Sequence, residues 1–463
     1  MTLSRYFHIS LLLVALLVAL LLGGCAKHQL YRSALTICEG VDTEQTCAQH
    51  AMARESSAGQ AEDDYLLAFI EFDDQGQLFS REQMRAVTDE LNRMTALDDL
   101  LMVVFVHGWK HSAAPNDSNI HTFRETLRRL SLLESNMSRL QNRKPRQVAG
   151  IYLGWRGGSL TLPVLKELTF WERKNTAHKV GRGALTEVLN HLELIRNTRN
   201  HLVSDETHRA ETRLVVVGHS FGGAVVYSSL SQILMSRFVD TLGPVSVVSD
   251  VVGFGDLVVL INPAFEAARF SSLSDMANER SSYFESQLPV MAILTSEADG
   301  ATKYAFPMGR GLSTLFETYR ATDRVNPVND AQVKIDQREA NIQAVGHYRP
   351  YRTHTLKAEG PASPALPTIE DTLSQFRTVS QGWEDDAPGS RIYFDGSVLE
   401  RSLDSVGKNP YLVIQVDEAL IGGHNEIDDP RIASFVRQLI LLSSQQADPD
   451  ARRQLRELLP PAQ

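Results

Sequence analysis

The segment GHSFG, residues 218–222, places a single serine between glycines. A serine hydroxyl attacks a carbonyl carbon when a neighbouring base removes its proton, and the attack forms a covalent acyl intermediate. The five-residue pattern is weak evidence by itself. Its surroundings strengthen it, because the apolar run LVVV at 214–217 precedes the serine and a helix-like apolar sequence follows it. A strand, a sharp turn and a helix are the context that exposes a nucleophilic serine.

The glycines around Ser220 have a physical reason. A serine in such a turn sits in strained backbone, and side chains at Gly218 or Gly222 would collide with the adjacent strand and helix. The N-terminus of the following helix also favours a developing negative charge. We therefore predict that Ser220 is a nucleophile and that Gly218 and Gly222 support its turn.

The elements that must position this serine alternate between strands and helices. Apolar runs without alternation are typical of strands buried on both faces of a parallel sheet. The chain therefore predicts an α/β fold with a mostly parallel central sheet and helices on both faces. Two stretches without a strand pattern, about 156–211 and 302–408, are expected to be insertions into one domain. The expected strands are 65–72, 100–109, 148–155, 212–220, 256–264, 289–297 and 410–417.

Two further motifs stand where a hydrolase of this kind needs them. FVHGW, residues 105–109, ends an early strand, and GGHNEI, residues 422–427, follows the last one. With these motifs, residues 63–445 resemble the α/β-hydrolase superfamily, and the chain resembles a bacterial esterase or lipase-like lipoprotein. The resemblance implies an oxyanion hole formed by the main-chain N–H groups of Trp109 and Phe221. His107 and Gly108 would support the first of these donors.

The acid of the triad is expected after a late strand, since the family's chain order is serine, acid, histidine. Asp299 lies just past the strand 289–297 and is the predicted acid, which would orient the histidine. Glu297 and Glu266 also follow strands and remain alternatives.

The predicted base is His424, in the turn between the last strand and the last helix. His347 and His354 precede that strand and are alternatives that either line a pocket or lie on the surface. His219 adjoins the nucleophile and cannot readily aim at its neighbour's hydroxyl, so we expect it to pack or to form a pocket wall.

The N-terminus carries an export signal. Arg5 precedes an apolar run at 9–22 that is shorter than the ~20 residues of a spanning helix, and LGGC follows at 22–25. This resembles a bacterial lipoprotein signal over residues 1–24, which implies that Cys25 carries lipid. An uncleaved anchor is the alternative. Ala26 after the cysteine implies sorting to the outer membrane, so the expected location is the cell envelope, at the periplasmic face of the outer membrane.

Residues 25–62 are polar and are expected to form a tether. An exported compartment permits a disulfide between Cys38 and Cys47 within it, although two free thiols remain possible. Residues 446–463 read as a polar tail.

Composition excludes several classes of protein. The 463-residue chain is 43% hydrophobic and 22% charged, with a net charge of −10, and it has no basic stripe interleaved with aromatic residues. Nucleic acid is therefore not an expected partner. His107 and His111 lie in a loop-like segment that does not favour a metal site, and the chain contains no Walker or dinucleotide motif. We expect neither a metal nor a cofactor, and the sequence does not indicate an oligomeric state.

Together these features predict a serine hydrolase that cleaves a small-molecule or lipid carboxylic ester through a Ser-His-Asp triad and an acyl-enzyme. An acyltransferase, a thioesterase or an amidase could use the same triad. A non-catalytic envelope lipoprotein on a hydrolase fold is a further alternative. The apolar stretch 160–171 could cover the site as a lid, or the 156–211 insertion could be scaffold packing.

Overall fold

The structure is a computed structural model that describes residues 28–39, 46–55, 64–158, 170–202, 211–243, 247–314, 316–361 and 368–444. The expected signal segment, Cys25 and the tail 446–463 lie outside these residues. None of the described helices combines the length and apolarity needed to cross a bilayer.

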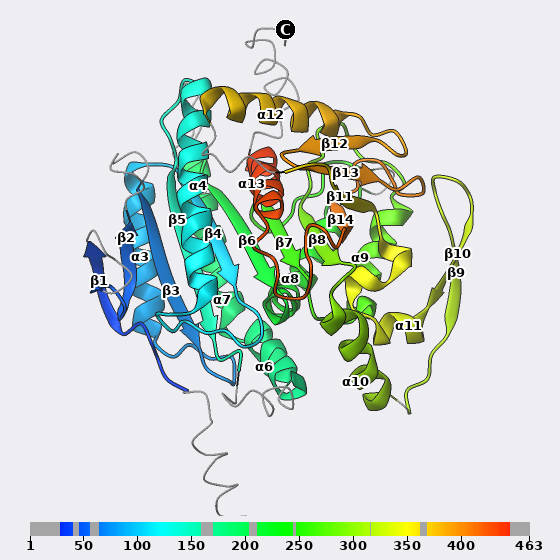
Figure 1. Ribbon diagram of the computed structural model, residues 1–463, viewed down its shortest axis with the longest axis horizontal. Coiled ribbons are helices and arrows are strands. Elements are labelled where there is room, and N and C mark those ends of the chain that lie inside the picture. The colour runs from blue at the N-terminus through cyan, green and yellow to red at the C-terminus, as the bar shows by residue number, and fades with distance from the viewer. Residues whose placement is uncertain are drawn as a thin grey trace, which may run out of the picture.

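A twelve-stranded sheet forms the centre of the molecule (Figure 1). From β3 through β5, β4, β6, β7, β8 and β14 to β11, each strand pairs in parallel with the next. Antiparallel pairs occur only toward the two edges of this sheet, where β2 meets β3 and β13 meets β11 and β12. The predicted α/β fold with a mostly parallel sheet is confirmed.

All seven expected strands are present, with bounds within a few residues of the prediction. They are β3 (Tyr65–Phe72), β4 (Leu100–Val106), β5 (Gln147–Trp155), β6 (Arg213–His219), β7 (Leu257–Ile261), β8 (Met291–Ser296) and β14 (Tyr411–Val416).

Helices cover both faces of the sheet. Successive residues of a strand point to opposite faces, and in the central strands both sets of side chains are apolar. Val216 packs into one hydrophobic core, whereas Val215 and Val217 pack into the other. The first face carries α3 (Arg81–Leu97), α6 (Phe170–Arg182), α7 (Ala184–Leu202), α8 (Phe221–Val239) and α9 (Ala267–Glu279). The second carries α4 (Ser118–Leu140), α12 (Ile369–Glu384) and α13 (Pro430–Ser444), the face toward the viewer in Figure 1.

Two predictions about the edges of the sheet are wrong. The expected tether contains β1 (Ala34–Glu39) and β2 (His50–Glu55), which extend the sheet beyond β3, and Cys38 and Cys47 form a disulfide between them. The stretch 302–408 contains β11 (His354–Ala358), β12 (Arg391–Phe394) and β13 (Ser397–Arg401) of the same sheet. Polar and charged residues interrupt the sequences of these strands, so they lack the continuous apolar runs that marked the central strands.

The described part of the 156–211 stretch is scaffold. Val180 of α6 and Leu185 and Leu189 of α7 are fully buried in the first core. Residues 159–169, which hold most of the expected lid, lie outside the described residues.

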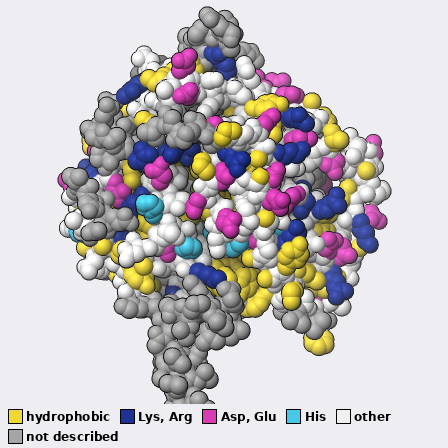
Figure 2. All heavy atoms as spheres, in the orientation of Figure 1, with side chains coloured by type: hydrophobic (Ala, Val, Ile, Leu, Met, Phe, Trp, Pro, Cys, Tyr) yellow, Lys and Arg dark blue, Asp and Glu magenta, His cyan; other side chains and the backbone are white. Residues whose placement is uncertain are grey.

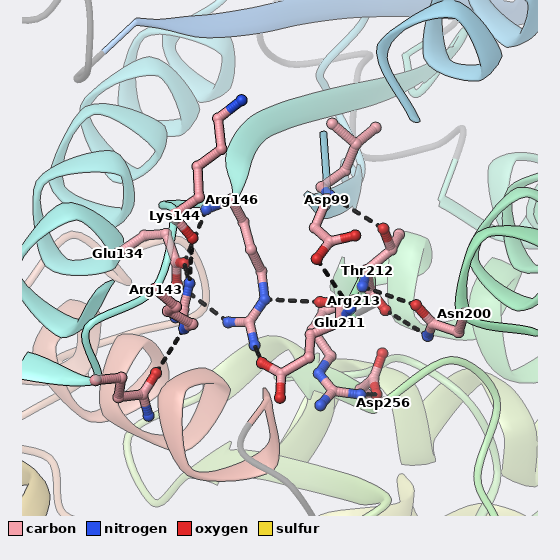
Figure 3. A network of polar contacts seen from close by, with 12 residues as sticks. Asp99, Glu134, Arg143, Lys144, Arg146, Asn200, Glu211, Thr212, Arg213 and Asp256 are labelled. Carbon is pink, nitrogen blue, oxygen red and sulfur yellow. Dashed lines mark hydrogen bonds and ion pairs between the residues drawn. The ribbon is translucent and has the colours of Figure 1, made fainter. Parts of the chain in front are cut away.

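The amino ends of the central strands are tied together by buried ion pairs (Figure 3). Arg146, directly before β5, bonds Glu134 of α4 at 3.2 Å and Glu211 before β6 at 2.6 Å. Asp256, before β7, accepts the Leu214 N–H at 2.7 Å and pairs with Arg213 at 3.4 Å. These contacts hold the strands in register at the edge opposite Ser220.

Candidate active site

Ser220 occupies the turn between β6 and α8. Its backbone has φ +57° and ψ −121°, a conformation that costs an L-residue about 1–3 kcal/mol. Two hydrogen bonds to the neighbouring chain hold it there: the Ser220 N–H donates to the Ile261 carbonyl at 2.9 Å, and the Ala264 N–H donates to the Ser220 carbonyl at 3.1 Å. The strain presents the side chain at the carboxyl edge of the sheet rather than along the helix.

The flanking glycines are required by close packing. A Cβ on Gly218 would lie 2.8 Å from the Gly222 carbonyl oxygen, and one on Gly222 would collide with the carbonyl of Val106 in the neighbouring strand. Neither glycine has a positive φ. The expected reason for these glycines, collision with the adjacent strand and helix, is confirmed.

The structure brings Ser220, His424 and Asp299 together in one hydrogen-bonded line. The Ser220 Oγ lies 2.6 Å from His424 Nε2, and His424 Nδ1 lies 2.9 Å from Asp299 Oδ2. The three residues follow β6, β14 and β8, three strands whose carboxyl ends meet at one edge of the sheet. Ser220 is buried and the His424 side chain is 12% exposed, so the imidazole is the group of this line that solvent reaches.

Asp299 is fully buried, and its carboxylate accepts three further hydrogen bonds. Its Oδ1 accepts the N–H groups of Ala301 and Thr302 at 3.0 and 3.1 Å, and its Oδ2 accepts the Thr302 hydroxyl. Burial acts to raise the pKa of Asp299, but the hydrogen bonds from His424 and Thr302 outweigh it and lower that pKa. A fixed carboxylate in this position selects the His424 tautomer whose Nε2 faces Ser220 as an acceptor.

Behind Asp299 the hydrogen-bonded line continues to His347. Because the Thr302 hydroxyl donates to Asp299, it accepts from His347 Nε2, at 2.9 Å. Burial lowers the pKa of His347 to about 4, so its ring is neutral near pH 7. His347 therefore supports the acid from the far side and does not contact Ser220. The sequence suggested only a pocket or surface position for this histidine.

A separate set of contacts holds the turn that carries His424. His219 Nε2 lies 3.0 Å from the His424 carbonyl oxygen, and Asn262 Nδ2 donates to the same oxygen at 3.1 Å. The Ser296 hydroxyl donates to the Ile421 carbonyl at 2.5 Å, and its N–H donates to Asn262 Oδ1 at 2.9 Å. Burial lowers the pKa of His219 to about 3, which keeps the ring neutral. His219 thus positions the base without contacting the serine hydroxyl.

Sequence reasoning missed Asn262, Ser296 and Thr302. Asn262 and Ser296 lie at the carboxyl ends of β7 and β8, where neighbouring strands meet the site, and Thr302 lies three residues after Asp299. These residues could have been predicted from their type and position, because polar residues at the ends of strands next to Ser220 are candidates for the site.

The segment 105–109 lies against Ser220. A Cβ on Gly108 would come within 2.7 Å of the Ser220 Cβ. His107 is fully buried, accepts the Trp155 N–H at 3.0 Å through Nε2, and stacks on the Trp155 ring. Burial lowers its pKa to about 4. His107 is therefore a neutral structural residue that fixes the path of the chain into Gly108 and Trp109.

Aromatic rings line the side of the site next to Trp109. Phe170 lies 5.2 Å from the Trp109 ring and 4.8 Å from the Phe221 ring, measured between centroids. On the segment after Asp299, Tyr304 and Met308 are 63% and 74% exposed. Trp109 and Phe221 thus belong to the first hydrophobic core beside Ser220, with the partly buried Phe170 packed against both rings.

The alternative acids lie elsewhere. Glu266 is buried in an ion-pair cluster with Lys174, Arg269 and Arg310, whose charges overcome burial and lower its pKa to about 2. Glu297 accepts a hydrogen bond from Gln415. The alternative base His354 is buried in β11 beside Thr353. None of these side chains has a recorded contact with Ser220 or His424 among the described residues.

No group of three or more histidine, cysteine, aspartate or glutamate side chains suited to a metal ion occurs in the described part of the chain. His111, which the sequence paired with His107 as a weak metal candidate, bonds Asp117 at 2.9 Å, and Asp117 caps α4.

Comparisons with known proteins add little. No family model matches the chain, and no curated protein matches it. Among solved structures, the phospholipase PlaB from Legionella pneumophila in complex with thio-NAD is similar at 15% identity and a TM-score of 0.25. The match covers 77% of this chain and 61% of that one. Similarity this low carries no inference about the site, which must be interpreted from its own geometry.

Proposed function

We propose that this chain is a serine hydrolase that cleaves carboxylic esters with an apolar acyl group. The observation that carries the proposal is the hydrogen-bonded line from Ser220 Oγ to His424 Nε2 and from His424 Nδ1 to Asp299, at 2.6 and 2.9 Å. A serine in strained backbone, an imidazole within hydrogen-bond distance of its hydroxyl and a buried carboxylate form the arrangement that activates a hydroxyl.

The reaction proceeds in two halves. His424 Nε2 takes the Ser220 proton as Oγ bonds to the ester carbon, and Asp299 stabilises the imidazolium that forms. His424 then passes the proton to the leaving alkoxide as the C–O bond breaks, which leaves an acyl-Ser220 ester. A water molecule gives its proton to His424 and attacks the acyl carbon, after which Ser220 regains its proton and the carboxylic acid leaves.

The negative charge that develops on the ester oxygen needs donors in place before the reaction. We propose the main-chain N–H groups of Phe221 and Trp109. Phe221 is the first residue of α8, so its N–H has no partner within the helix and lies at the positive end of the helix dipole. Trp109 follows Gly108, which packs on Ser220. Each such donor contributes about 3–4 kcal/mol to transition-state stabilisation.

The apolar character of the substrate is inferred from the apolar residues that adjoin the catalytic line in the chain or pack beside it. The rings of Trp109, Phe170 and Phe221 pack together on the oxyanion side, and the exposed Tyr304 and Met308 lie on the segment that follows Asp299. Lipid esters and small apolar esters both fit these surroundings.

A fluorophosphonate probe tests the nucleophile. We expect the purified protein to be labelled and Ser220→Ala to be unlabelled, with both folded by circular dichroism. His424→Ala should be labelled at least 10³-fold more slowly. Equal labelling of the wild type and Ser220→Ala would refute the proposal. A panel of p-nitrophenyl esters of increasing acyl length should then give the highest kcat/KM with an acyl chain longer than acetyl.

We further propose that the chain is exported and anchored by lipid on Cys25, at the periplasmic face of a bacterial outer membrane. The Cys38–Cys47 disulfide supports export, because disulfides persist in oxidising compartments. Metabolic labelling with a radioactive fatty acid in a bacterial host tests the anchor. Wild type should be labelled and Cys25→Ser should not, and label retained by Cys25→Ser would refute the anchor.

A further inference from the structure

A cavity of about 390 Å³ lies between α4 and α13, on the second face of the sheet. Its floor is apolar and consists of Val103, Phe105, Val217 and Ile261, which point from β4, β6 and β7. Small-molecule sites usually measure about 300–1,000 Å³. We call this space the α4–α13 cavity. Figure 2 shows the face of the molecule on which the two helices lie, where charged side chains of both signs alternate with apolar ones.

One end of the cavity is cationic. Arg437 of α13 and Arg129 of α4 both line it, and Arg437 is 8% exposed. Among the described residues, no hydrogen bond or ion pair is recorded for Arg437. Two carboxylates also line the cavity, and both already have partners. Glu125 is bonded to Arg128 and Arg129 at 2.8 and 2.6 Å, and Asp428 accepts the Thr122 hydroxyl at 3.3 Å.

Burial, and to a smaller extent the charge of Arg129, lowers the pKa of Arg437 to about 10, although the charges of Glu125 and Asp395 act to raise it. The group is therefore still charged near pH 7. The cavity combines an apolar floor with a mostly buried guanidinium that has no hydrogen-bonded or ion-paired partner among the described residues.

We propose that the α4–α13 cavity binds a fatty carboxylate, with the carboxylate on Arg437 and the alkyl chain along the apolar floor. A planar guanidinium matches a carboxylate through two parallel hydrogen bonds. The floor offers no partner for a polar chain, and Arg437 is the lining charge without a hydrogen-bonded partner among the described residues, which favours an anionic head. An anionic head with a single apolar chain is the ligand class that satisfies both ends.

The cavity lies behind the base of the candidate active site. Ile427 and Asp428, which follow His424 by three and four residues, form part of its wall. Val217 and Ile261 of the floor precede His219 and Asn262, whose side chains hold the His424 carbonyl. The proposal rests on the cavity and its charges and does not require the hydrolase function. An esterase with apolar substrates would nevertheless produce this ligand.

Calorimetric titration of full-length Ser220→Ala protein with dodecanoate tests the proposal, because this variant cannot turn over an ester. We expect one dodecanoate per chain. Adding Arg437→Gln should weaken binding at least tenfold, while Arg93→Gln, which removes an arginine of α3 that pairs with Glu90, should leave it unchanged. Dodecanol should bind at least tenfold more weakly than dodecanoate. Dodecanol binding as tightly as dodecanoate, or dodecyl phosphate binding more tightly, would overturn the carboxylate assignment.

A second pair of variants separates loss of the site from loss of the fold. Ala433→Leu, on the α13 wall, reduces the cavity while keeping Arg437, and it should also weaken dodecanoate binding at least tenfold. Arg437→Met should unfold at the same temperature as the parent or at a higher one, because it replaces a mostly buried guanidinium that makes no hydrogen bond or ion pair among the described residues by an apolar side chain. Binding that survives both Arg437→Gln and Ala433→Leu would place the ligand elsewhere and refute the proposal. Neither result bears on fluorophosphonate labelling of Ser220 in the wild-type protein.

Discussion

Replacing Gly108 by alanine is the most direct perturbation of the packing between the 105–109 segment and the nucleophile. The added Cβ would stand 2.7 Å from the Ser220 Cβ and 3.0 Å from the His219 carbonyl oxygen. Ordinary carbon contacts begin near 3.4 Å, so the two segments must separate by about 0.7 Å. Gly108 does not have a positive φ, so the backbone itself accepts alanine and the cost is steric.

This separation would disturb both the nucleophile and the proposed oxyanion hole. Moving Ser220 lengthens its 2.6 Å hydrogen bond to His424, and moving residue 108 displaces the Trp109 N–H from the proposed oxyanion position. A misplacement of about 1 Å costs a reaction on the order of 10²-fold, or about 2.7 kcal/mol. Overpacking costs about 1–3 kcal/mol of folding free energy. We therefore expect a folded variant with kcat/KM reduced about 10²-fold.

The assay is hydrolysis of p-nitrophenyl butyrate, with the unfolding temperature measured on the same samples. Gly311→Ala is the matched control, because it makes the same chemical change in α10 (Phe306–Ser313) where a Cβ would meet no atom within 4 Å. It should keep full activity. If Gly108→Ala keeps kcat/KM within threefold of the wild type, Gly108 does not set the geometry of the site and the reasoning is refuted.

Three further perturbations follow from the site. Asp299→Asn keeps the shape but removes the charge that fixes the His424 tautomer, so kcat for the same ester should fall about 10³–10⁴-fold, and a loss under tenfold would contradict the role of Asp299. Asn262→Asp replaces the amide that donates to the His424 carbonyl by a carboxylate that repels it, so kcat should fall about 10²-fold with little change in KM. An unchanged kcat would show that this hydrogen bond does not position His424. Burial lowers the pKa of His107 to about 4 and that of His219 to about 3, against about 6.5 unfolded. Below pH 6.5 these histidines therefore bind protons in the unfolded chain but not in the folded one. Each should lower the free energy of unfolding by about 1.4 kcal/mol per pH unit until the pH reaches its folded pKa. Urea unfolding at pH 7.5 and 5.5 measures the loss, and equal stability at both would show that these rings are not buried neutral.

The amino-acid sequence by itself determined the central strands and the turn at Ser220. Both are local: a strand buried on both faces is a continuous apolar run, and a crowded turn needs glycines at fixed offsets from its serine. The predicted strands also placed Asp299 and His424 where the α/β-hydrolase order of acid and base would put them. In the structure His424 bonds Ser220 and Asp299 bonds His424.

The tertiary structure decided what depends on contacts between distant segments. Glu266 and Asp299 both follow strands, and only the fold pairs one with Lys174 and the other with His424. Likewise, the role of His219 depends on a carbonyl 205 residues away. The edge strands escaped prediction because polar residues interrupt their apolar sequence. The place of Arg437 in the wall of a cavity could not be foreseen, since the cavity exists only once α4 and α13 have been placed on the sheet.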